Sequence, residues 1–163
     1  MAMHPEDVLK GRMAEALVNE LLRACGNKVY RFGYETVLQN LTQLEQTFKK
    51  YTRTSKIIRS IPDLVVVNKQ GEPFFVEVKF RTNEASRPWF NKKEWGELKD
   101  ICRYWNAVLI LVTTKPPYFM IFDDSTYKKG KNTLVSIGND KKFGIKSDIL
   151  EKFNSLVEKY YLR

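Results

Sequence analysis

Residues 61–81 read IPDLVVVNKQGEPFFVEVKFR, and this stretch decides the fold. Two apolar runs, Ile61–Asn68 and Pro73–Arg81, flank the polar tetrapeptide Lys69-Gln70-Gly71-Glu72. β-Branched and aromatic residues fill both runs, and a short polar segment with a glycine is typical of a turn between adjacent strands. The segment therefore predicts a β-hairpin.

Apolar periodicity predicts further elements on both sides of the hairpin. The expected helices are Pro5–Cys25, Val37–Lys50, Lys92–Trp105 and a last one that begins at Ser147 or Asp148. The expected strands are Val29–Tyr34, Ala107–Thr113, Tyr118–Phe122 and a short edge strand, Leu134–Ile137. The polar stretches Lys49–Ser60 and Asp123–Asn132 are expected to be loops, the first of them a loop or a frayed helical extension. This order predicts one α/β domain over residues 1–163, with a mixed central sheet flanked by helices.

The charge balance favours a polyanionic partner. The chain has 163 residues, with 28 Lys and Arg against 19 Asp and Glu, and so a formal charge of +9. A basic domain of this size is attracted to phosphate backbones. No apolar run approaches the ~20 residues of a membrane span. The N-terminus has no apolar stretch of a secretory signal, so we expect a cytoplasmic protein without a membrane partner.

The histidine and cysteine counts exclude several kinds of chemistry. His4 is the single histidine, and Cys25 and Cys102 are the only cysteines. Mechanisms that need two histidines, such as those of zinc hydrolases and His-dependent ribonucleases, are therefore excluded, as is a disulfide framework. If the chain is an enzyme, its chemistry uses carboxylates and lysine.

Three charged residues interrupt the apolar hairpin. Asp63 begins the first strand, and Glu77 and Lys79 lie on one face of the second because strand side chains alternate. Two neighbouring carboxylates at an apolar sheet need a compensating cation, and oxygen ligands without histidine suit Mg²⁺, for which Mn²⁺ is expected to substitute. With the Val78 backbone carbonyl as a further ligand, this pattern predicts a metal site for phosphodiester hydrolysis, in which Lys79 orients water or stabilises negative charge.

The chain resembles the PD-(D/E)xK nuclease superfamily. The signature corresponds to Pro62-Asp63 followed by Glu77-Val78-Lys79, and Gly11-Arg12-Met13-Ala14-Glu15 is similar to the G-x-x-A-E segment of archaeal Holliday-junction resolvases and some restriction enzymes. The resemblance implies a restriction-endonuclease-like α/β/α sandwich and a metal-dependent DNA endonuclease without a small-molecule cofactor. It also implies that Glu15 reaches the metal site, and it raises a homodimer as an option.

The resemblance covers about residues 11–122, with an insertion at about 35–60 and a C-terminal extension at 123–163. Insertions of this kind often decide the substrate in the family. No separate specificity region is evident, which favours DNA structure over a long base sequence as the recognised feature, with branched DNA in recombination, repair or mobile-element processing as one class. The candidate DNA-binding cations flank the hairpin and are Arg59, Arg81, Arg87, Lys92, Lys93 and Lys99.

Two other functions stay open at this point. One is a catalytically silent nucleic-acid-binding module on a nuclease fold, and the other is a basic structural subunit of a larger complex. For Asp63 alone, a turn aspartate after Pro62 is a sufficient explanation. Four aromatic residues are expected in the core rather than at nucleobases: Trp89, Phe90, Trp95 and Trp105. For Trp89-Phe90, which basic residues flank, contact with nucleic acid is the alternative.

Overall fold

The chain is described by a computed structural model over residues 4–33, 52–82, 90–122 and 134–162. The helices are α1 (Pro5–Ala24), α3 (Arg53–Arg59), α4 (Lys92–Trp105), α6 (Ser147–Tyr161) and a 3₁₀ turn, η1 (Ile137–Asn139). The strands are β1 (Lys28–Arg31), β2 (Leu64–Val67), β3 (Pro73–Arg81), β4 (Ala107–Thr113), β5 (Phe119–Phe122) and β6 (Val135–Ser136). Within these described ranges, every helix is too short or too polar to span a bilayer.

The six strands form one mixed sheet in the order β1-β2-β3-β4-β5-β6. The predicted hairpin is confirmed: β2 and β3 are antiparallel, with Leu64 opposite Val76, and Gly71 has a positive φ of 82° in the turn. Only β3 and β4 are parallel among these pairs, and α4 connects them. A crossover helix of this kind is needed because parallel strands cannot be joined by a tight turn.

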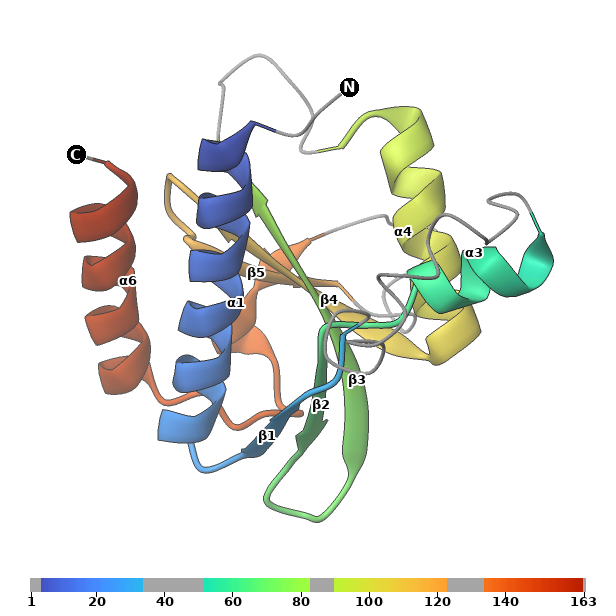
Figure 1. The fold of residues 1–163 in the computed structure, drawn as a ribbon. Helices are drawn as coiled ribbons and strands as arrows, with labels where there is room; N and C mark the ends of the chain where they lie inside the picture. The colour runs from blue at the N-terminus through green and yellow to red at the C-terminus, as the bar shows by residue number, and fades with distance from the viewer. Residues whose placement is uncertain (1–3, 34–51, 83–89, 123–133, 163) are drawn as a thin grey trace.

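Helices cover both faces of the sheet (Figure 1). α1 and α6 lie together on one face, over the larger core, in which Val18, Val76 and Val157 are fully buried. α4 lies on the opposite face, where Leu98 packs with Leu109 in a second core. The expected α/β sandwich, with helices on both sides of a mixed sheet, is therefore observed.

The C-terminal segment is part of this arrangement. α6 packs beside α1, and the Tyr161 hydroxyl donates a hydrogen bond of 2.8 Å to the Lys10 carbonyl. The ring of Tyr161 stacks on Phe80 of β3, with centroids 4.4 Å apart. The short edge strand expected near residues 134–137 is present as β6, and the expected C-terminal helix is present as α6.

One expectation about local structure is wrong. Residues 53–59, within the stretch expected to be a loop or frayed extension, form the separate helix α3. Its N-cap, Thr52, accepts a hydrogen bond from the Ser55 amide at 3.1 Å, which satisfies an amide that would otherwise lack a helical partner. Ile57 and Ile58 are half-buried, so the helix has an apolar side despite its basic sequence. The expected helix over 37–50 and the expected loop over 123–132 lie outside the described residues.

Candidate active site

Asp63 is held at the point where β1, β2 and β3 meet. Its carbonyl accepts hydrogen bonds from the Phe32 amide at 2.8 Å and the Gly33 amide at 3.0 Å. Its carboxylate accepts one from the Val78 amide at 2.7 Å. The last β2–β3 pair joins Leu64 to Val76, so the Val78 amide lies beyond the ladder and takes a side chain as its acceptor. Hydrogen bonds from neighbouring segments thus hold both the main-chain carbonyl and the side chain of Asp63.

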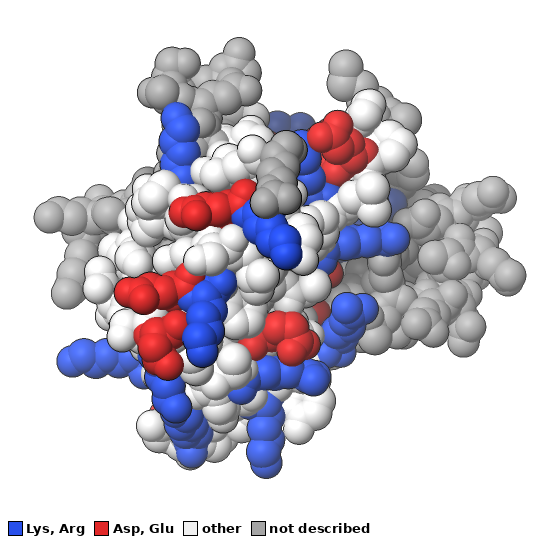
Figure 2. Space-filling view, turned by 90° about the vertical axis from the view of Figure 1, so that its left-hand side faces the viewer, with Lys and Arg blue, Asp and Glu red and all other residues white. Residues whose placement is uncertain are grey.

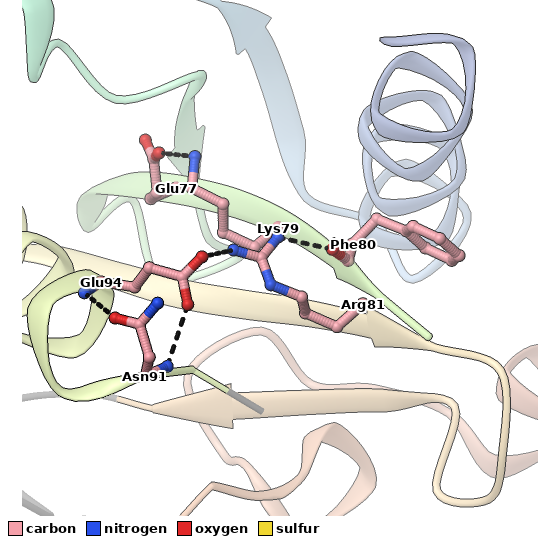
Figure 3. Close-up of polar contacts among 6 residues, drawn as sticks. All are labelled: Glu77, Lys79, Phe80, Arg81, Asn91 and Glu94. Carbon is pink, nitrogen blue, oxygen red and sulfur yellow. Dashed lines mark hydrogen bonds and ion pairs between the residues drawn. The ribbon is translucent and has the colours of Figure 1, made fainter. Parts of the chain in front are cut away.

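Glu77 and Lys79 lie on the α4 side of β3. Their neighbours in the strand, Val76 and Val78, face the α1 side and are buried. The Lys79 ammonium and the Glu77 carboxylate form an ion pair (Figure 3). Glu77 is only 5% exposed, which is rare for a carboxylate unless it is paired. The pair explains how the strand tolerates this charge, at a cost of desolvation.

The pKa values of this pair reflect burial and crowding. The pKa of Glu77 is raised from 4.5 to about 7, chiefly by burial and to a smaller extent by the negative charges of Asp63 and Glu15, while Lys79 opposes the rise. Burial by itself would lower the pKa of Lys79, but the charges of Glu77 and Asp63 outweigh it, and the pKa is raised. A divalent cation beside the carboxylates would favour their ionised form.

Glu15 reaches this region from the α1 layer. It is half-buried on α1, and its charge is the smallest of the influences on the Glu77 pKa. Across residues 4–33, 52–82, 90–122 and 134–162, no three His, Cys, Asp or Glu side chains are gathered closely enough to hold a metal ion. The structure thus brings Asp63, Glu77 and Lys79 together, with Glu15 nearby but not gathered into one cluster with them.

The donor set suits a hard divalent cation. Asp63 and Glu77 offer carboxylate oxygens, which Mg²⁺ prefers, and Mg²⁺ typically uses only one or two protein carboxylates plus water and substrate phosphate. The Val78 carbonyl points to the side on which Asp63 lies, because the amide and carbonyl of one strand residue share a direction. Asp63, Glu77 and the Val78 carbonyl all offer oxygen atoms, so the residues present fit Mg²⁺.

Arg81 continues the row of charged side chains on β3, and its side chain is directed toward Glu94 of α4 (Figure 3). Its guanidinium donates to the Phe80 carbonyl at 2.8 Å and to Glu94 at 3.0 Å, and it lies 4.9 Å from the centre of the Phe90 ring. Glu94 is also part of a capping box, in which it accepts from the Asn91 amide at 2.9 Å. Arg81 therefore ties the end of β3 to the first turn of α4.

The remaining candidate cations are spread over two helices. Arg59 is exposed in the last turn of α3, and Lys92 and Lys93 are exposed in the first turn of α4. The Lys99 ammonium lies 5.6 Å from the centre of the Trp95 ring. Arg87 lies outside the described residues. On the face formed by α6, basic and acidic side chains are interleaved rather than separated (Figure 2).

Two features of the site were not found from the sequence. Glu94 is the partner of Arg81, and its signal was the spacing Asn91-x-x-Glu94, which is a capping-box pattern. The second feature is a cluster of Phe32, Phe75 and Trp105 beside the carboxylates. No local pattern predicts that cluster, because its members come from three separate elements.

Comparison with known proteins returns a solved structure. No family model matches the chain, and no curated protein matches its sequence. The chain is similar to the structure of Hjc, a Holliday junction resolvase from the archaeal hyperthermophile Archaeoglobus fulgidus, with 18% identity and a TM-score of 0.39. The match covers 87% of this chain and 98% of that one. The candidate site is defined by the contacts of the chain's own residues.

Proposed function

We propose that this chain is a metal-dependent nuclease that hydrolyses phosphodiester bonds in DNA. The observation that carries the proposal is the buried Glu77–Lys79 pair on β3, beside an Asp63 carboxylate held by the Val78 amide. Such a group of charges in an otherwise apolar hairpin is costly for folding and is typical of functional sites. The net charge of +9 suits a polyanionic substrate.

In this proposal Asp63 and Glu77 would hold Mg²⁺ or Mn²⁺, with the Val78 carbonyl as a backbone ligand. Glu15, which lies nearby on α1 but outside this group, stays the ligand that the family resemblance predicts. A metal held by these residues would supply Lewis-acid chemistry, that is, polarisation of the phosphoryl oxygen and a more acidic water. Lys79 lies next to Glu77 and stabilises the negative charge that develops on the phosphate or orients the attacking water. A bound cation would offset the burial and the Asp63 charge that raise the Glu77 pKa, and Glu77 would then be ionised at neutral pH.

The finer points of the proposal concern the substrate and assembly. We propose one nuclease domain over the chain that is directed by DNA structure, such as branched or junction DNA, rather than by a long base sequence. Arg59, Lys92 and Lys93 are exposed and suited to backbone phosphates. Arg81 is less suited to that role, because it already contacts Glu94 and the Phe90 ring. A homodimer that acts on two strands stays a prediction, which sedimentation velocity would test.

Cleavage assays with a charge-neutral variant test the proposal. Supercoiled plasmid, linear duplex, single strand and four-way junction would be incubated with Mg²⁺, Mn²⁺ or EDTA. Asp63→Asn keeps an oxygen that can accept from the Val78 amide but removes the charge, so the fold should persist while cutting falls at least about 100-fold. Lys79→Met should do the same. Asp148→Asn, in the first turn of α6, is the matched control and should cut normally.

Each outcome of this assay decides something. Metal-dependent cutting that is lost in both site variants would support the nuclease, and the preferred substrate would identify its class. Cutting that survives Asp63→Asn would contradict the assignment of the site. DNA binding with no cutting under any condition would instead support the non-catalytic binding module.

A further inference from the structure

Three aromatic side chains lie beside the carboxylates, on the α4 side of the sheet. Phe75 is two residues before Glu77 in β3 and shares its face. Phe32 donates its amide to the Asp63 carbonyl at 2.8 Å. The Phe32 and Phe75 ring centroids are 5.3 Å apart, and Trp105, at the end of α4, lies 5.4 Å from Phe75. All three residues are half-buried, so part of the cluster is open to solvent.

The geometry of this cluster differs from that of the other aromatic contacts. Phe90 and Trp95 stack face to face at an interplanar angle of 4°, and Phe80 and Tyr161 at 16°. Trp105 instead meets both of its partners nearly edge-on, at 75° and 72°. Phe32 and Phe75 are tilted by 38°, so no pair in the cluster stacks in parallel, and each edge-to-face contact covers only part of a ring face.

A hydrogen bond attaches the cluster to the basic helix α3. The Trp105 indole N–H donates to the Ser60 hydroxyl at 3.1 Å, and Ser60 is the residue that ends α3. This contact satisfies the polar edge of the indole and leaves its apolar surface for other contacts. This hydrogen bond therefore places the C-terminal end of α3 next to the cluster.

The segment around α3 carries only positive charge. Between Gln46 and Pro62 the sequence contains no Asp or Glu and five cations: Lys49, Lys50, Arg53, Lys56 and Arg59. Arg53, Lys56 and Arg59 are exposed on α3. Arg59 is four residues before Asp63, so their Cα atoms are at most about 14 Å apart. With phosphates about 3.4 Å apart along each strand axis, Arg59 lies within a few nucleotides of a phosphate bound at the carboxylates.

We propose that Phe32, Phe75 and Trp105 form a stacking surface for one unpaired nucleobase of the DNA strand at the active site, with the adjoining phosphates held by α3. The proposal rests on the proposed function and names its substrate class. A base inside a duplex is covered on both faces, so only a frayed, branched or single-stranded nucleotide offers a free face. The surface thus selects DNA that carries an unpaired nucleotide next to the bond that is cut.

Binding of matched strands to the Asp63→Asn protein in EDTA tests this inference without cleavage. The probes are a labelled twelve-nucleotide dT strand, an abasic strand of the same length and charge, and a blunt duplex, compared by fluorescence anisotropy. The dT strand should bind about 5- to 150-fold more tightly than the abasic strand, which is the usual effect of stacking one base. Adding Phe32→Leu should remove most of that preference.

Control variants keep the result decisive. Tyr160→Leu removes a 55% exposed aromatic ring from α6, across the sheet from the cluster, and should leave the preference intact. If Phe32→Leu fails to fold, Trp105→Phe, which keeps an aromatic ring but removes the Ser60 contact, replaces it and should weaken the preference. Equal affinity for dT and abasic strands, no binding of any strand, or a preference untouched by these variants would overturn the inference.

The outcomes also separate this inference from the proposed function. Metal-dependent cutting without a base preference would overturn the stacking surface and leave the nuclease. A base preference lost in Phe32→Leu, from a protein that never cuts, would support the stacking surface on a non-catalytic binding module.

Discussion

Replacing Glu77 by Gln is expected to remove a pH dependence from the stability of the metal-free protein. Burial raises the pKa of Glu77 from 4.5 to about 7. The folded state therefore binds more protons than the unfolded state between these pH values, and the free energy of unfolding falls as pH rises through them. The contribution is fully present below pH 4.5 and lost above about pH 7. At about 1.4 kcal/mol per pH unit, the total loss is about 3 kcal/mol.

The charged groups near Glu77 do not reverse this fall of stability with rising pH. The negative charges of Asp63 and Glu15 act in the same direction as burial, and the positive charge of Lys79 opposes it. The pKa of Lys79 is itself raised above 10.5, so its contribution is constant across the window from pH 4 to pH 8. Glu77 is therefore expected to dominate the difference between the two proteins in that range.

Urea unfolding in EDTA from pH 4 to pH 8 measures this effect. The stability of the Glu77→Gln protein should rise relative to wild type by about 3 kcal/mol across the series. Glu97→Gln, an exposed carboxylate on α4, is the control and should run parallel to wild type. Parallel curves for Glu77→Gln as well would refute the claim that Glu77 is a desolvated carboxylate.

Metal addition extends the same measurement. A cation held by Asp63 and Glu77 favours ionised Glu77, so Mg²⁺ should flatten the wild-type pH profile and stabilise the protein at pH 8. At a concentration of 100 times Kd, the expected gain is about 2.7 kcal/mol. The Glu77→Gln protein should gain much less. A wild-type profile that Mg²⁺ leaves unchanged would contradict the metal site but not the burial of Glu77.

Two further variants test contacts that support the site and the fold. Glu94→Gln keeps an acceptor for the Asn91 amide but loses the partly exposed ion pair with Arg81, so the free energy of unfolding should change by less than about 1 kcal/mol. Glu94→Ala also removes the cap, so it should lower the free energy of unfolding by about 1 kcal/mol more, as measured by thermal unfolding. Equal losses would contradict the double role of Glu94. Gly26→Ala should destabilise the fold by about 1–2 kcal/mol in urea titrations because Gly26 has a φ of 91°, and its Cβ would lie 2.7 Å from Lys69 Cε. In a Lys69→Ala background the clash with Lys69 is absent, so Gly26→Ala should cost less stability there but should still cost some because of the positive φ. A cost that is unchanged, or that disappears, in that background would contradict this reasoning.

Elements with strong local signals could be predicted from the sequence. The bounds of α4 follow from Asn91 as a cap at one end and from the apolar run that begins at Ala107 at the other. The β2–β3 hairpin follows from its apolar runs and the Gly71 turn. Placing Glu77 and Lys79 on one face needs only the two-residue period of a strand. In each case neighbours in the sequence determine the structure.

Contacts between distant elements could not be predicted in this way. The polar sequence of α3 hides a helix whose Thr52 cap and half-buried isoleucines are recognisable only in the fold. The cluster of Phe32, Phe75 and Trp105 depends on the packing of β1, β3 and α4 against one another. The direction of the Arg81 side chain likewise depends on where α4 places Glu94. Basic side chains that look alike in the sequence can therefore be exposed, as Arg59 is, or can bind another part of the same chain, as Arg81 does.

β3 shows why the candidate site and the fold constrain each other. The strand lies between β2 and β4 and has cores on both faces, so its local environment favours apolar residues at every position. Glu77 and Lys79 violate that preference, and their mutual ion pair reduces the cost without removing the desolvation that raises the Glu77 pKa. The Val78 amide, held by Asp63 at 2.7 Å, keeps a third charge close to the other two. A variant with apolar residues at positions 77 and 79 should consequently be more stable than wild type and inactive, which is the relation expected where a charge cluster serves chemistry rather than folding.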